Sequence, residues 1–198
     1  MSQSPVDDQL NPIRVYAQKE NLDAEHVTQV TRCALILFDL FQKRLNLHPA
    51  DRILLEAAAL MHDIGQKESF SGHHKIAQRF ILDSTLFEEF PKQDKQIISC
   101  VARYHRKGMP KSDHPIYCDL DESSQSIVRR LAGLLRVADG LDRTHDSSVQ
   151  DIQFTEDDEK IQLFIYFNNN NPTNIHGALR KYDLLESELE KPVQFITQ

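Results

Sequence analysis

A histidine and an aspartate stand side by side at the end of an apolar segment. Residues 54–64 carry leucine, alanine, methionine and isoleucine mostly at three- and four-residue steps, which predicts a helix with one broad buried face. His62 and Asp63 interrupt this face, and Gly65 is a plausible helix stop. A buried imidazole or carboxylate costs on the order of several kcal/mol unless it is satisfied, and a metal ion commonly satisfies both. The alternative is an aspartate that only orients a structural histidine.

Further candidate ligands occur at or near the ends of other predicted helices. They are His26 in the first long helix, His73 and His74 after a glycine-containing loop, His105 at the end of the next helix, and Asp139 in a later apolar face. Imidazoles and carboxylates together suit Mn²⁺, Fe²⁺, Mg²⁺ or Zn²⁺ better than a thiophilic metal. Each histidine alone is more often an ordinary polar residue. Their order along the chain, with the His-Asp pair, predicts a site for one or two divalent metal ions.

The elements that must position these residues are mostly helical. Apolar spacing predicts helices near residues 23–45, 51–63, 74–83, 92–104 and 123–143, after a frayed start that becomes helical near residues 13–18. Asp23 and Asp51 are the expected N-caps of the first two long helices. After residue 148 the period changes to two, which predicts a β-hairpin around an acidic turn at 156–159, and a helix over 175–190 closes the chain. The expected fold is mainly α, a helical bundle with a small C-terminal β-hairpin plus helix.

The same pattern suggests how the chain is divided. Residues 1–19 are expected to form an N-terminal extension, residues 20–147 the helical domain, and residues 148–198 a hairpin and helix packed on it. A chain of 198 residues suits one domain with a small appendage.

Composition narrows the class of protein. No apolar run approaches the ~20 residues that span a bilayer, and residues 1–11 are polar, unlike a signal peptide. Three widely spaced cysteines favour reduced thiols and a cytoplasmic location. The net charge of −7 argues against a nucleic-acid partner. We therefore expect no nucleic acid and no membrane as partners, and a homodimer is possible.

These motifs resemble those of a known family. The order His26, His62-Asp63, Asp139 resembles the signature of the HD superfamily of metal-dependent phosphohydrolases, and the insertion of His74 and His105 resembles its two-metal members. The sequence around these residues, roughly from residue 20 to residue 190, looks like the C-terminal domain of the exopolyphosphatase/guanosine pentaphosphate phosphatase (Ppx/GppA) family. The resemblance implies an HD-domain helical bundle.

The resemblance also implies roles for individual residues. Asp63 would bridge two ions, with His62 and Asp63 as the catalytic residues. One ion would be held by His26, His62 and Asp139, and the other by His74 and His105. His74 is preferred to His73 because Ile76 stands where the family often has another histidine. Independently of the resemblance, Arg106, Lys107 and Arg143 are basic residues near the presumed site in an acidic chain, and we expect them to bind the substrate phosphate. For Arg106 and Lys107, a solvated helix end is the alternative.

One departure from the family leaves the function open. The family's enzymes carry their polyphosphate chemistry in an N-terminal actin-like domain with glycine-rich phosphate loops, and no such loop occurs in these residues, which include six glycines. Some family members have degraded metal motifs in the helical domain, whereas every ligand position is filled here. The first hypothesis is a metal-dependent phosphohydrolase acting on a phosphomonoester, a phosphodiester, a nucleotide or a short polyphosphate. The alternatives are a catalytically idle domain that binds a phosphorylated ligand such as an alarmone or polyphosphate, and a scaffold.

Overall fold

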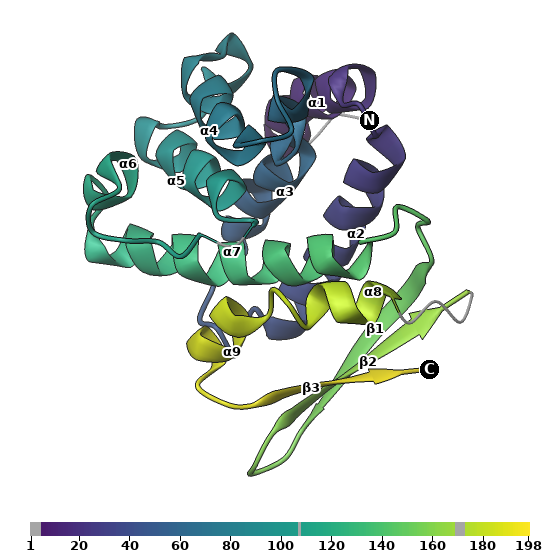
Figure 1. The fold of residues 1–198 in the computed structure, drawn as a ribbon. Helices are drawn as coiled ribbons and strands as arrows, with labels where there is room; N and C mark the ends of the chain where they lie inside the picture. Colours follow the sequence, from purple (N-terminus) through teal and green to yellow (C-terminus); the bar gives the residue numbers. More distant parts are fainter. Residues whose placement is uncertain (1–4, 107, 169–172) are drawn as a thin grey trace.

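The computed structural model describes residues 5–106, 108–168 and 173–198. Between residues 20 and 145 this described part contains helices and turns but no strand, and a small three-stranded sheet lies near the C-terminus (Figure 1). The predicted fold class, mainly α with a C-terminal hairpin, is confirmed. No helix of the described chain is long and apolar enough to cross a membrane. The division into an extension, a helical domain and an appendage stays a prediction, as does the cytoplasmic location.

The helices that carry the candidate ligands lie close to their predicted positions. They are α2 (Ala24–Phe41), α3 (Asp51–Met61), α4 (His73–Asp83), α5 (Lys92–Arg103) and α7 (Glu122–Leu141). Asp23 caps α2 as predicted, because its Oδ1 accepts a hydrogen bond from the backbone N–H of His26 at 2.9 Å. Asp51 is the first residue of α3 and not its N-cap, and its Oδ2 accepts from the backbone N–H of His48. The helix therefore begins one residue earlier than expected.

Short turns connect these helices. After α3 the chain forms the 3₁₀ segment η1 (Ile64–Lys67), after α4 the 3₁₀ segment η2 (Thr85–Phe87), and before α7 the short helix α6 (Pro115–Cys118). α3 has ended before Gly65, which lies inside η1, so the helix stop expected at Gly65 is wrong by several residues. This early end places His62 at the C-cap of α3 and Asp63 just beyond it.

The N-terminal segment differs from its prediction. α1 spans Pro5–Glu20, longer than a start that becomes helical near residue 13. Leu10, Ile13 and Ala17 are buried at a three- to four-residue spacing, and α1 packs against α2 and α3. The mixed polar sequence hides this stripe, which is stabilised by tertiary packing more than by helix propensity.

α7 is the central helix of the molecule. It packs against α2, α3 and α5 on one side and against α8 (Thr173–Ala178) and α9 (Asp183–Leu189) on the other, as Figure 1 shows. Val128, Leu131, Leu134, Leu135 and Val137 on this helix are fully buried. A helix covered on several sides can hold a charged residue away from solvent, and Asp139 lies in its last turn.

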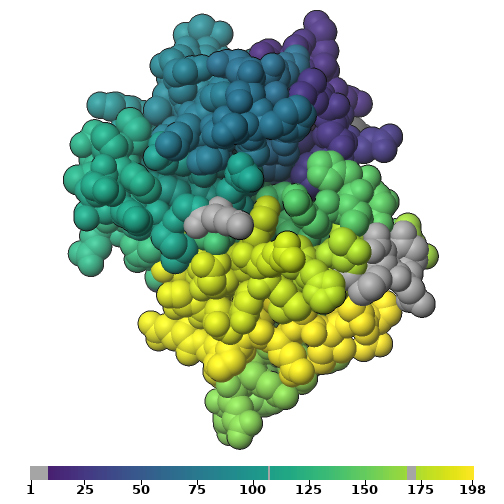
Figure 2. Space-filling model, viewed as in Figure 1, coloured from purple at the N-terminus to yellow at the C-terminus, as the bar shows by residue number. Residues whose placement is uncertain are grey.

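The C-terminal region contains the largest departure from prediction. The hairpin of β1 (Val149–Glu156) and β2 (Ile161–Phe167) forms as expected, with Ile161, Leu163 and Ile165 buried at period two. The single helix expected over residues 175–190 is wrong, because α8 and α9 are separate short helices. A third strand, β3 (Val193–Thr197), then pairs parallel with β2. The C-terminal segments lie against the helical body in the space-filling view (Figure 2).

Candidate metal centre

Five helix ends bring the candidate ligands together. His26 lies in the first turn of α2, His62 and Asp63 follow the last turn of α3, His73 opens α4, His105 follows α5, and Asp139 lies in the last turn of α7. All four imidazoles and Asp139 are buried, and the side chain of Asp63 is 12% exposed. The predicted convergence of these helix ends is therefore observed, with His73 in the position expected for His74.

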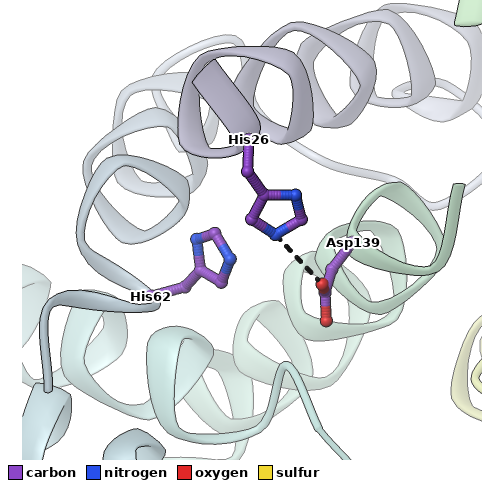
Figure 3. A group of neighbouring side chains, drawn as sticks. All are labelled: His26, His62 and Asp139. Atoms are coloured by element: carbon purple, nitrogen blue, oxygen red, sulfur yellow. Dashed lines mark ion pairs between the residues drawn. The ribbon is translucent and has the colours of Figure 1, made fainter. Parts of the chain in front are cut away.

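The first cluster consists of His26, His62 and Asp139 (Figure 3). One ligand atom from each lies within 4.8 Å of the others. His26 Nε2 is 3.5 Å from Asp139 Oδ1, and the ring centroids of His26 and His62 are 5.6 Å apart. Figure 3 shows the three side chains pointing toward a common point from α2, the end of α3, and α7. Such a group can hold a metal ion.

The second cluster consists of Asp63, His73 and His105, whose ligand atoms also lie within 4.8 Å of one another. His73 Nε2 is 3.1 Å from both Asp63 Oδ1 and His105 Nε2. His73 therefore faces this cluster in the structure, whereas the sequence favoured His74. The His74 ring centroid is 6.5 Å from that of His105, and burial together with the charge of His73 lowers the pKa of His74 to about 4. Adjacent helical residues point about 100° apart, so only one of the pair faces the cluster.

Asp63 lies between the two clusters. Its Oδ2 is 3.6 Å from His62 Nε2 and 3.8 Å from His26 Nε2, in the first cluster. Its Oδ1 is 3.1 Å from His73 Nε2 and 3.6 Å from His105 Nε2, in the second. One carboxylate thus presents one oxygen to each cluster, the arrangement that a bridging ligand requires.

The other ring nitrogen of each histidine is held by an acceptor. Nδ1 of His62 donates to the carbonyl of Ala59 at 2.6 Å, and Nδ1 of His105 donates to that of Ala102 at 2.7 Å. His73 donates in the same way to Phe70 O at 3.0 Å, and His26 donates to Asp142 Oδ2 at 2.8 Å. A carbonyl oxygen can only accept, so in the neutral rings these contacts place the Nε2 lone pair toward the clusters. Metal-bound histidines show the same outer hydrogen bond.

Two features of the ring nitrogens show whether these residues fit a metal ion: one nitrogen without a partner and one close pair. Within the described chain, the buried Nε2 of His62 has no hydrogen-bond partner, and such an orphan group is costly. His73 Nε2 and His105 Nε2 face each other at 3.1 Å, which two lone pairs tolerate only with a cation or proton nearby. The donor set of imidazoles and carboxylates therefore fits a divalent cation such as Mn²⁺, Fe²⁺ or Zn²⁺.

The chain matches a known protein family over most of its length. Residues 11–192 match the family described as Ppx/GppA phosphatase, domain III. The chain belongs to this family. The resemblance noted in the sequence is thereby confirmed, and in this Ppx/GppA domain III the match includes every residue of both clusters.

Charges around the first cluster balance one another. Burial lowers the pKa of His26, but hydrogen bonds with Asp139 and Asp142 outweigh it and raise that pKa to about 10. Burial would raise the pKa of Asp139, but the Lys181 ammonium and His26 hold it well below its usual range. The two carboxylates thus favour the protonated form of His26 in the isolated chain, and a metal ion bound there would displace that proton.

In the second cluster burial decides the pKa of His105 but not that of Asp63. Burial, with the charge of His62 nearby, lowers the pKa of His105 to about 3, so this ring stays neutral. Burial would raise the pKa of Asp63, but the neighbouring His62 and the hydrogen bond with His73 outweigh it and lower that pKa. A neutral imidazole beside an ionised carboxylate is the protonation state that metal binding requires.

A basic pocket adjoins the centre in this Ppx/GppA domain III. Its volume is about 560 Å³, and its lining includes Arg106 and Arg143, both predicted to bind phosphate, with His176, Arg180 and Lys181. Arg106 directly follows His105, and Arg143 lies four residues after Asp139, just beyond the end of α7. Lys107, the other predicted phosphate ligand, lies outside the described residues. The pocket brings cations from three segments together in an acidic chain, as an anion site requires.

Sequence reasoning missed several of the residues at the site. His145 stacks on His26 with ring centroids 3.9 Å apart, and its Nδ1 contacts Asp23 Oδ2 at 2.7 Å. Asp142, which supports His26, was visible only as an acid three residues after Asp139. Arg180 and Lys181 lay inside a segment predicted as one uninterrupted helix. No local signal distinguished these residues, because their role depends on the packing of α8 against α7.

Proposed function

We propose that this Ppx/GppA domain III is a metal-dependent phosphohydrolase with a His/Asp centre for one or two divalent ions. The observation that carries the proposal is the convergence of four Nε2 atoms on the Asp63 carboxylate, each ring fixed by an outer acceptor. His26, His62 and Asp139 would hold one ion, His73 and His105 the other, and Asp63 would bridge them. His74 is not among the proposed ligands, because it lies outside both clusters.

Each group has a definite task in this proposal. A bound divalent ion supplies Lewis acidity, lowering the pKa of coordinated water and neutralising charge on phosphoryl oxygens. The chain's own residues fix the ligands. The carbonyls of Ala59 and Ala102 hold His62 and His105 in one tautomer, and Asp142 holds His26. Asp63 keeps its carboxylate ionised between the two clusters, which makes it the residue on which the centre most depends.

The basic pocket is the observation that favours a phosphorylated substrate in this proposal. Arg106 and Arg143 are exposed, and among the described residues neither forms a hydrogen bond or an ion pair. Their guanidinium groups are free to make paired hydrogen bonds to phosphate oxygens. In a chain with a net charge of −7, such a site would repel a phosphate without local cations. A phosphomonoester, phosphodiester, nucleotide or short polyphosphate would satisfy this chemistry.

The test is a metal analysis followed by a phosphatase screen. Protein purified without chelator should retain a divalent metal, and the metal-replete protein should hydrolyse at least one generic phosphoester. Chelation should abolish turnover and re-addition of Mn²⁺ should restore it. Asp83→Asn, which removes an exposed carboxylate remote from both clusters, should behave as wild type, whereas Asp63→Asn should be inactive. Tight binding of a phosphorylated ligand without turnover would instead indicate the idle ligand-binding domain.

A further inference from the structure

Lys181 is shared by the metal centre and the basic pocket. Its ammonium forms an ion pair with Asp139 Oδ2, and its side chain is only 16% exposed. The same side chain lines the pocket with Arg106, Arg143 and Arg180. The other oxygen of Asp139 faces His26 Nε2 at 3.5 Å in the first cluster. One flexible cation thus contacts a candidate metal ligand and an anion site at once.

The backbone around Lys181 is fixed, so only its side chain is free to move. The backbone N–H of Lys181 donates to Ala178 O at 2.9 Å, and its carbonyl accepts from the buried Arg136 Nε at 3.1 Å. A Cβ on Gly140 would lie 2.6 Å from the Cα of Ala178, so α8 sits directly on the end of α7. A lysine stem has several rotatable bonds and can redirect its ammonium without moving this framework.

A divalent ion and Lys181 would compete for Asp139. Both are cations attracted to the same carboxylate, Lys181 at Oδ2 and an ion in the first cluster at the oxygen that faces His26, and like charges a few ångströms apart in a buried site repel each other. While Lys181 pairs with Asp139, the first cluster is less attractive to a metal ion. Binding of a metal ion is therefore favoured when the ammonium finds another partner.

The basic pocket offers that partner when an anion occupies it. Its described lining contains no carboxylate, so an anion there would be surrounded by the guanidinium groups of Arg106, Arg143 and Arg180 and would attract Lys181 as well. We propose that Lys181 couples the two sites: a tetrahedral dianion in the pocket draws Lys181 from Asp139 and so tightens metal binding at the first cluster. By thermodynamic linkage, a bound metal tightens anion binding by the same factor. The coupling rests on the metal centre proposed above.

The experiment measures Mn²⁺ affinity by titration calorimetry in chloride and in sulfate buffers of equal ionic strength. Wild type should bind Mn²⁺ about tenfold more tightly in sulfate, a coupling of ordinary size. Lys181→Met should bind Mn²⁺ more tightly than wild type in chloride, because the competing charge is gone, and sulfate should then change its affinity less than about twofold. Arg180→Met should lose most of the sulfate effect, since it removes a pocket cation that does not contact Asp139.

Matched controls separate the possible failures. Lys92→Met removes one positive charge from the exposed start of α5 and should keep the wild-type sulfate effect. If the wild type binds Mn²⁺ with equal affinity in both buffers, the coupling is overturned. A full sulfate effect in Lys181→Met also overturns it, because the anion would then act on the metal by direct contact. If Lys181→Met does not fold, an undiminished effect in Arg180→Met overturns it. Absence of Mn²⁺ binding in every buffer overturns the metal centre itself, and the coupling with it.

Discussion

The two ligand clusters differ in charge although both are built from histidine and aspartate. In the first cluster Asp139 contributes a carboxylate, a second carboxylate on Asp142 supports His26, and Lys181 balances them. In the second cluster Asp63 is the one carboxylate, and the outer acceptors of His73 and His105 are carbonyl groups. A histidine supported by a carboxylate is a more basic ligand than one supported by a carbonyl. We therefore expect the first cluster to bind its ion more tightly, and the second cluster to lose its ion first.

The largest effect should come from the residue that the clusters share. Asp63→Asn keeps the side-chain shape but removes the charge that lies between both groups of imidazoles. Metal affinity should fall more than about 100-fold at both clusters, beyond the usual cost of losing an outer partner. Metal content after gel filtration measures this, with Asp83→Asn as the control. Unchanged metal content would refute the bridging assignment.

The second-largest effect should be the loss of one metal ion from the second cluster only. His73→Ala should reduce the bound metal from two ions to one, leaving the first cluster occupied, because His73 lies in the second cluster only. His74→Ala is a matched control, since it removes the neighbouring imidazole, which lies outside both clusters. Elemental analysis of the two variants gives the comparison. If His74→Ala loses an ion and His73→Ala does not, the structural choice between them is wrong.

A smaller effect should appear in turnover and not in metal content. Arg106→Ala should lower kcat/KM by one to two decades, because one charge-assisted contact with a phosphate is worth about 1.5–3 kcal/mol. Arg106→Lys should retain only part of the wild-type kcat/KM if the contact involves two hydrogen bonds. Steady-state kinetics at fixed metal and ionic strength on the phosphoester found by screening decides this. A change below twofold would indicate that Arg106 only occupies a solvated helix end.

The smallest effect should come from the outer support of the first cluster. Asp142→Asn keeps an oxygen that accepts from His26 Nδ1 but loses the negative charge. Mn²⁺ affinity at the first cluster should fall about tenfold, the lower end of what outer partners contribute, with the second cluster unchanged. Competition titration with a chelating dye resolves the two affinities. An equal loss at both clusters would show that Asp142 acts through the fold and not through His26.

Much of the centre was predictable because its residues interrupt regular apolar patterns. His62 and Asp63 end an apolar helix, and Asp139 breaks the buried face of α7, so each departs from what its helix requires. The choice between His73 and His74 was beyond such reasoning. Both begin the same helix, and which one faces inward depends on how α4 is rotated against α5. The family tendency at position 76 pointed to His74, which lies outside both clusters.

The C-terminal region was predictable only where its signals were local. The hairpin follows from alternating residues in β2 and a turn in which Asp157 Oδ1 accepts two backbone N–H groups. The break between α8 and α9 depends on contacts with α7, and the pairing of β3 with β2 joins residues more than thirty positions apart. Because the basic pocket is completed by residues in this region, Arg180 and Lys181 could not be recognised beforehand.

The most direct test of the account is the number of metal ions that the folded chain holds. Chelator-treated protein should be dialysed against Mn²⁺, desalted and measured by elemental analysis alongside a thermal melt. We expect up to two Mn²⁺ per chain and a raised melting temperature, because a ligand that binds only the folded state stabilises it. The paramagnetic spectrum should show coupling when both ions share Asp63. A folded chain that retains no Mn²⁺ or Zn²⁺ and melts at the same temperature with and without metal would contradict the metal centre.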